Sequence, residues 1–122
     1  MTYNFDRFLR YDEMVSWLHD LQKQFPGLVA LETYGKSYKG RDLWIATVTD
    51  TSTGAHNTKP AHWIDANIHA TEATGSVAAL FILEYLANNF GKHDQVTEAL
   101  RTRTFYIAVS YTHLTLPTIY SV

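Results

Sequence analysis

The sequence contains no cysteine among its 122 residues. This absence excludes disulfide bonds, thiolate metal sites and a cysteine nucleophile. Any metal ion bound by this chain would therefore have to be held by histidine, aspartate or glutamate. The chain also lacks an excess of charge of either sign, because its formal net charge is -2 and its acidic and basic residues are interspersed. It has no basic stripe of the kind that binds nucleic acid.

Long apolar runs are missing as well. Nothing in the sequence reaches the length of a membrane-spanning helix, and the first residues, "MTYNFDRFLRYDEM", have acidic side chains where a signal peptide would have its apolar core. We therefore predict a cytoplasmic protein with no nucleic-acid partner and no membrane partner. A small molecule or a peptide is the expected ligand. The composition leaves the oligomeric state open.

Hydrophobic residues make up 46% of the chain, enough for the core of one domain or for part of a larger one. Apolar positions at helical spacing predict an amphipathic helix over residues 11–25, which Pro26-Gly27 ends. Two strands are predicted over residues 28–34 and 42–49. The loop "GKSYKGR" between them favours an antiparallel hairpin.

The second half of the sequence predicts a strand that leads directly into a helix. The strand covers residues 61–68, and the largely apolar helix over residues 74–91 is expected to be buried. A strand followed at once by a helix is typical of an α/β sheet. A short helix over residues 94–103 and a strand over residues 104–109 complete the pattern.

His69 and Glu72 are the candidate metal ligands. They stand three residues apart where the strand over residues 61–68 ends, and ligands in open α/β sheets bind beyond the carboxyl ends of the strands. Imidazole and carboxylate groups suit zinc, whose catalytic sites usually have three protein ligands and one open position. A His-x-x-Glu pair is expected by chance about 0.25 times in a chain of this composition, so the spacing alone is weak evidence and leaves a structural role open.

Several separate motifs resemble the amino-terminal part of the zinc carboxypeptidases of the carboxypeptidase A and T type. They are "YGKSYKGRDLWIATVTD", "KPAHWIDANIHATEATGS" and "ALRTRTFYIA", and they occur in the family's order over about residues 8–108. The first contains the family's Gly-x-Ser-x-x-Gly-Arg loop, here Gly35, Ser37, Gly40 and Arg41.

The resemblance implies a fold, a cofactor and a substrate. The fold would be α/β, a three-layer α/β/α arrangement with a mixed sheet, described as carboxypeptidase-like or phosphorylase/hydrolase-type, of which this chain holds the amino-terminal part. The cofactor would be Zn²⁺, with His69 and Glu72 as two of its three protein ligands. The substrate would be a peptide with a free carboxy terminus.

Other polar residues near these motifs are given structural or supporting roles. Asp65 is expected either to orient a metal ligand or to be a hydrogen-bonded structural carboxylate. Arg41 is expected to form an ion pair that stabilises its loop, and His62 to be structural. The remaining upstream histidines are expected to be solvated: His19, His56 and His93.

The family's third zinc ligand, its substrate-binding arginines and its general-base glutamate lie further along the chain than any motif found here. From Val109 the sequence departs from the family pattern, and "VSYTHLTLPT" resembles the translation of a transposon-end adapter. We therefore expect residues 1–108 to be the amino-terminal part of a catalytic domain and residues 109–122 to be a non-native tail. His113, within that tail, is not expected to bind the metal.

Three functions follow from these observations. The first is a zinc-dependent metallocarboxypeptidase that is truncated and inactive as written. The second is a zinc amidohydrolase that acts on acyl-amino acids or murein peptides, since related folds use the same pair of ligands. The third is a non-catalytic binding domain that shares only the spacing. The groups that bind a terminal carboxylate would distinguish the first from the second.

Overall fold

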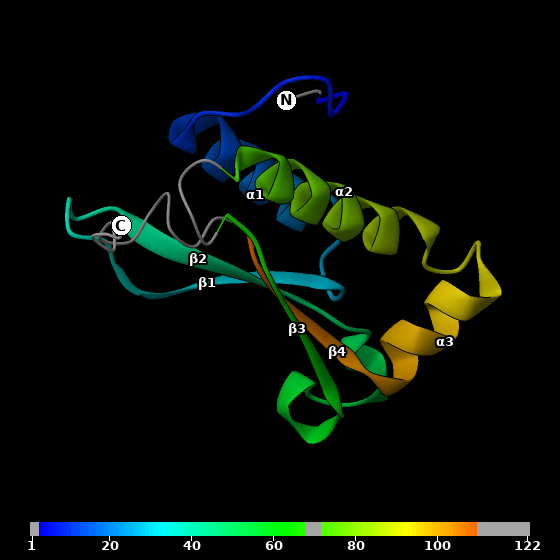
Figure 1. The fold of residues 1–122 in the computed structure, drawn as a ribbon. Coiled ribbons are helices and arrows are strands. Elements are labelled where there is room, and N and C mark those ends of the chain that lie inside the picture. Colours follow the sequence, from blue (N-terminus) through cyan, green and yellow to red (C-terminus); the bar gives the residue numbers. More distant parts are fainter. Residues whose placement is uncertain (1–2, 68–71, 110–122) are drawn as a thin grey trace.

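A computed structural model describes residues 3–67 and 72–109. Its elements form one mixed sheet with helices packed against it (Figure 1). The helices are α1 (Tyr11–Gln24), α2 (Ala73–Asn89) and α3 (Asp94–Thr102), the strands are β1 (Val29–Lys36), β2 (Asp42–Val48), β3 (Ala61–Asp65) and β4 (Thr104–Ala108), and two short 3-10 turns are η1 (Thr51–Thr53) and η2 (His56–Thr58). Each predicted helix and strand is present, with ends that differ from the prediction by a few residues.

The strands lie in the order β1-β2-β4-β3. β1 pairs with β2 as the predicted antiparallel hairpin. β4 is antiparallel to β2 and parallel to β3, so the sheet is mixed as predicted. The chain passes from β3 to β4 through α2 and α3, which provides the long connection that parallel neighbours require.

Backbone hydrogen bonds and a glycine with positive φ form the turn between β1 and β2. The backbone N–H of Gly40 donates to the carbonyl oxygen of Ser37 at 2.9 Å, and the N–H of Ser37 donates to the carbonyl oxygen of Arg41 at 2.7 Å. Gly40 has a φ of 81°, a conformation that glycine adopts without the steric cost that other residues incur. The loop therefore closes the hairpin tightly.

Helices α1 and α2 cover the same face of the sheet, and α3 lies beyond the end of the sheet at which β4 begins (Figure 1). The core fills the space between α1, α2 and the sheet. Its fully buried side chains include Leu18, Val48, Leu80, Leu83, Leu100 and Ile107. The described residues thus supply a helical layer and the sheet, two of the three layers predicted, and they confirm the α/β class.

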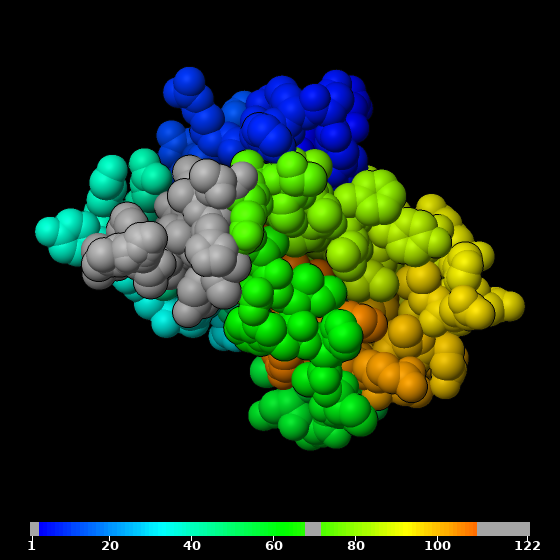
Figure 2. Space-filling model, in the orientation of Figure 1, coloured from blue at the N-terminus to red at the C-terminus, as the bar shows by residue number. Residues whose placement is uncertain are grey.

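The opposite face of the sheet is more open. Side chains alternate along a strand, so Trp63 points away from the face on which the neighbouring Ile64 packs against the core, and Trp63 is 51% exposed. Figure 2 shows β3 in green at the surface, with α2 in yellow-green above it.

Helix α2 differs from its prediction. It was expected to be buried, but Phe81, Ile82 and Tyr85 are 51%, 37% and 43% exposed. Phe81 packs edge-on against Phe5, with ring centroids 5.4 Å apart. Apolar residues occupy most of the circumference of α2, so its sequence could not indicate which face would be covered. Within residues 3–67 and 72–109, no helix is long and apolar enough to cross a membrane.

Candidate functional site

The carboxyl end of β3 holds the candidate site in place through a backbone contact and a sharp turn. The N–H of Ala66 donates to the carbonyl oxygen of Ala108 at 3.1 Å, which continues the pairing with β4 by one residue. Asn67 then adopts a positive φ of 58° and is buried. Asparagine tolerates this left-handed conformation better than most residues, so the extended conformation of β3 does not continue through Asn67.

Gly75 brings the first turn of α2 against that end of β3. A Cβ atom at Gly75 would lie 3.3 Å from the backbone nitrogen of Asn67 and 3.6 Å from the Cβ of Ala66. Such a contact is tight because backbone cannot swing aside as a side chain can. Neither Gly75 nor Asn67 was identified from the sequence, although a glycine inside a predicted helix is a signal of close packing.

Glu72 precedes α2 and is exposed. It borders a cavity of about 390 Å³ between β3 and the start of α2, which we call the β3–α2 cavity. The cavity is lined by Ile64, Asp65, Ala66, Asn67, Glu72, Gly75, Ala78, Ala79 and Ile82. Glu72 is exposed beside this cavity, and a carboxylate is a suitable ligand for a zinc ion.

The other half of the predicted pair, His69, lies outside the described residues. Among residues 3–67 and 72–109, no group of three histidine, aspartate or glutamate side chains is arranged to hold a metal ion. The oxygen donor of Glu72 suits zinc, which accepts carboxylate, imidazole and thiolate ligands. The assignment of His69 and Glu72 as zinc ligands stays a prediction.

Asp65 lies at the edge of the same cavity, and it makes a structural hydrogen bond. The indole nitrogen Nε1 of Trp63 donates to Oδ2 of Asp65 at 2.7 Å. Both side chains are exposed on the open face of the sheet. Of the two roles predicted for Asp65, the hydrogen-bonded structural carboxylate is the one for which the described residues provide a partner.

Arg41 does not form the predicted ion pair with any described residue. Its guanidinium lies over the ring of Tyr11, 5.2 Å from the ring centroid. Its backbone N–H donates to Oγ of Ser37 at 3.1 Å. The cation–π contact joins the hairpin loop to the start of α1, so the loop is stabilised by an aromatic ring rather than by a carboxylate.

Three histidines were expected to be solvated: His56 and His93 are exposed as predicted, whereas His19 is only partly exposed. Nδ1 of His19 lies 2.9 Å from the carbonyl oxygen of Val15, and its ring packs edge-on against Trp44 at 5.0 Å. Nδ1 of His56 lies 2.7 Å from the hydroxyl of Tyr106. His93 accepts from the N–H of Val96. His62 was expected to be structural; it is exposed, and its ring lies near that of Phe105.

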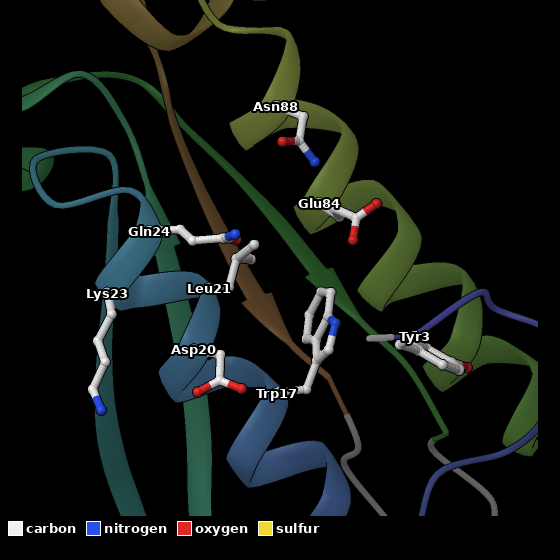
Figure 3. A pocket seen from close by; sticks show the side chains of 8 residues that line it. All are labelled: Tyr3, Trp17, Asp20, Leu21, Lys23, Gln24, Glu84 and Asn88. Atoms are coloured by element: carbon white, nitrogen blue, oxygen red, sulfur yellow. The ribbon is translucent and has the colours of Figure 1, made fainter. Parts of the chain in front are cut away.

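A second cavity, which we call the α1–α2 groove, lies away from the predicted metal ligands. It has a volume of about 470 Å³ and runs between the two helices that cover the sheet (Figure 3). It is lined by Tyr3, Trp17, Asp20, Leu21, Lys23, Gln24, Glu84 and Asn88. Burial raises the pKa of the Glu84 carboxyl above its ordinary value, since desolvation disfavours the charged form.

Two predictions fall beyond what the structure describes. Residues 110–122, which include His113, lie outside it, and the assignment of residues 109–122 as a non-native tail stays a prediction. The cytoplasmic location also stays a prediction.

The chain matches a known family and several curated relatives. The family model described as "Zinc carboxypeptidase" matches residues 14–111. Carboxypeptidase A2 of Rattus norvegicus is 30% identical over 106 residues, which are 87% of this chain and 24% of the relative. Zinc carboxypeptidase A 1 of Drosophila melanogaster is also 30% identical, over 93% of this chain and 28% of the relative. The chain thus spans about a quarter of the length of these two relatives.

Solved structures agree on the fold. Thrombin activatable fibrinolysis inhibitor is 24% identical with a TM-score of 0.80, and the match covers 93% of this chain and 29% of that one. The carboxypeptidase A from Helicoverpa armigera is 23% identical with a TM-score of 0.75, over 90% and 27%. These similarities confirm that the sheet and its helices have the arrangement of a carboxypeptidase.

Proposed function

Because this chain belongs to the zinc carboxypeptidase family, we propose that it carries one part of a zinc site that hydrolyses carboxy-terminal peptide bonds. The substrate would be a peptide with a free carboxy terminus. The observation that carries the proposal is the position of Glu72, exposed at the border of the β3–α2 cavity beyond the end of β3.

In this proposal His69 and Glu72 hold the zinc ion. When bound, zinc supplies an acidified water and polarises a carbonyl group. The described residues around Glu72 keep the ligand in position. Gly75 lets the start of α2 pack against Ala66 and Asn67 at the end of β3, which places the backbone of Glu72 near that end of the sheet.

Two protein ligands are fewer than the three of a typical catalytic zinc site. We therefore expect the 122-residue chain to bind zinc weakly and to have no peptidase activity by itself. Zinc-dependent release of carboxy-terminal amino acids from a peptide by the purified chain would contradict the second expectation.

Zinc binding by the purified chain tests the proposal directly. Titration against a chromophoric chelator should give an affinity that E72Q and H69A each weaken by at least about tenfold, because E72Q removes the negative charge of one ligand and H69A removes the imidazole of the other. E98Q is the matched control, since Glu98 is exposed on α3 and the change is chemically the same as in E72Q. Equal affinities for E72Q, E98Q and the unaltered chain would refute the role of Glu72.

A further inference from the structure

Lys59 lies just before β3, and oxygen atoms surround its ammonium group. Nζ donates at 2.8 Å to Oγ1 of Thr49, at 2.8 Å to Oγ1 of Thr53 and at 2.8 Å to the carbonyl oxygen of Asp50. The carbonyl oxygen of Leu100 lies at 3.3 Å. We call these four oxygens the oxygen cage. They come from the segment after β2 and from the last turn of α3, two regions far apart in the sequence.

The two hydroxyl groups of the cage are oriented toward the lysine. An ammonium group can only donate, so each hydroxyl oxygen must accept from Nζ and send its own hydrogen elsewhere. Oγ1 of Thr49 lies 3.0 Å from the carbonyl oxygen of Leu100 and 2.8 Å from that of Arg103. Its hydrogen therefore points toward the end of α3 and its lone pairs point toward Nζ.

Thr53 has the same arrangement. Its Oγ1 lies 2.9 Å from the carbonyl oxygen of Asp50 and 2.7 Å from that of Arg101, and its single hydrogen is directed toward these acceptors. The last carbonyl groups of a helix have no partner within the helix, and a cation near them is favoured by the helix dipole. The cage thus combines oriented hydroxyl oxygens with the negative end of α3.

These neutral oxygens stabilise the charge of Lys59 by accepting hydrogen bonds from its ammonium group. No carboxylate forms an ion pair with Lys59 within residues 3–67 and 72–109. A partly buried charge is costly unless hydrogen bonds satisfy it, and the cage provides more acceptors than the ammonium has hydrogens. The arrangement is that of a small cation held by carbonyl and hydroxyl oxygens, as in sites where oxygens replace a cation's water shell.

The cage fixes the point at which β3 begins. Pro60 follows Lys59, its carbonyl oxygen accepts from the N–H of Thr104 at 3.0 Å, and Ala61 then starts β3 beside β4. In Figure 1 the segment that carries η1 lies next to the end of α3 and the start of β4. Lys59 therefore joins the end of α3 to the entry of the strand that leads to Glu72.

We propose that Lys59 is a positioning residue whose ammonium occupies a cation-binding oxygen cage, that this cage sets the entry of β3, and that it binds small primary alkylammonium ions when the lysine side chain is removed. The proposal concerns the amino end of β3 and does not depend on zinc binding or peptidase activity. The attraction between the ammonium and the oxygens, rather than packing of the lysine stem, holds the start of β3 in position.

Thermal unfolding of the full chain, followed by circular dichroism, tests the proposal. K59M keeps the length of the side chain but removes its charge, and it should lower Tm by roughly 5–10 °C. K59A should lower Tm as well, and propylammonium chloride should restore much of that loss because the ion supplies an ammonium group on a short alkyl stem. Tetramethylammonium chloride at the same ionic strength should restore nothing, since it has no N–H donor.

K39A is the matched control, because Lys39 is exposed in the hairpin loop. Its Tm should equal that of the unaltered chain, and propylammonium should not change it. Hydrogen exchange adds a readout of position: the amide of Thr104 should exchange faster in K59A and slow again with propylammonium. A K59A protein with unchanged Tm, or one rescued equally by both salts, overturns the proposal.

If K59A does not fold, refolding it in the presence of each salt tests the proposal in the same way. Recovery of the far-ultraviolet signal with propylammonium alone supports the proposal, and no difference between the salts refutes it. T53V provides an independent check, since it removes one oxygen from the exposed edge of the cage. It should lower Tm by less than K59M does, and an unchanged Tm would count against the cage.

Discussion

Polar groups at the amino end of β3 are hydrogen-bonded to one another, whereas polar groups along α2 lie beside cavities. At the amino end, the oxygens around Lys59 are joined into one hydrogen-bonded network that reaches the end of α3. Along α2, by contrast, carboxyl groups border cavities: Glu72 lies beside the β3–α2 cavity and Glu84 lines the α1–α2 groove.

The contrast separates a part of the molecule that maintains the fold from a part that can bind a ligand. In this network every hydrogen of the ammonium has an acceptor, and disrupting it leaves partly buried polar atoms without partners at a cost. A carboxyl group beside a cavity can change partners without disturbing the core. We therefore expect substitutions at the amino end of β3 to affect mainly stability and substitution of Glu72, beside the β3–α2 cavity, to affect mainly binding.

The largest effect on stability should come from L100A. Leu100 is fully buried and belongs to the turn of α3 that contributes to the oxygen cage. Removing its side chain should cost about 2–5 kcal/mol of the free energy of unfolding, because a cavity replaces packed atoms. Urea denaturation measures this loss. I82A, on the partly exposed face of α2, should cost much less. Equal losses for the two variants would contradict the expected difference in stability between the two regions.

G75V should have the next largest effect, because it tests the close approach of α2 to β3. The added side chain would press on the backbone at Asn67, and overpacking of this kind costs about 1–3 kcal/mol. The same urea titration applies. A78V places an identical side chain on the same helix at an exposed position. If the two variants were equally stable, Gly75 would not be needed for the close packing.

E84Q should change the pH dependence of stability. The folded state raises the pKa of Glu84 through burial, so the stability contributed by its neutral form is complete below the unfolded pKa and is lost as pH rises through the folded pKa. The amide of E84Q stays neutral throughout. Its Tm should therefore exceed that of the unaltered chain at neutral pH, and the difference should shrink in acid.

Asp20 and Lys23 also line the α1–α2 groove, and E84Q leaves both side chains in place, so neither accounts for a difference between the two proteins compared. E98Q, on the exposed surface of α3, serves as the control for loss of one carboxylate. A Tm difference between E84Q and the unaltered chain that stays constant from acid to neutral pH would contradict the assignment.

D65A should have the smallest effect on stability. It removes the acceptor for the indole N–H of Trp63 on the exposed face of the sheet, where such interactions contribute little. Tm should change by no more than about 2 °C. The fluorescence of Trp63 should change nonetheless, while D65N, which keeps an acceptor oxygen, should resemble the unaltered chain. Identical spectra for D65A and D65N would mean that the hydrogen bond is not maintained in solution.

The elements could be predicted from the sequence because their periodicity is local. The spacing of apolar residues in α1 and the glycine-rich loop between β1 and β2 each carry their own signal, and the structure confirms both. The mixed sheet followed from the resemblance to a family, since the pairing of β2 with β4 depends on residues far apart in the chain.

The partners of individual side chains could not be predicted in the same way. Arg41 was assigned an ion pair and lies over the ring of Tyr11. His19 was expected to be solvated and packs against Trp44. The partner in each case comes from another element, and no local pattern indicates which elements will meet. The same holds for Lys59, whose cage includes a carbonyl oxygen at the end of α3.

The strand order has a consequence for the sequence of events during folding. β3 follows the β1-β2 hairpin in the chain, yet within the described residues its hydrogen-bonded neighbour is β4, which follows α2 and α3. β3 therefore cannot complete its pairing until β4 is in place, and this long-range step is slow relative to hairpin formation. We expect the strand that leads to Glu72 to be incorporated late, after the hairpin has provided a template.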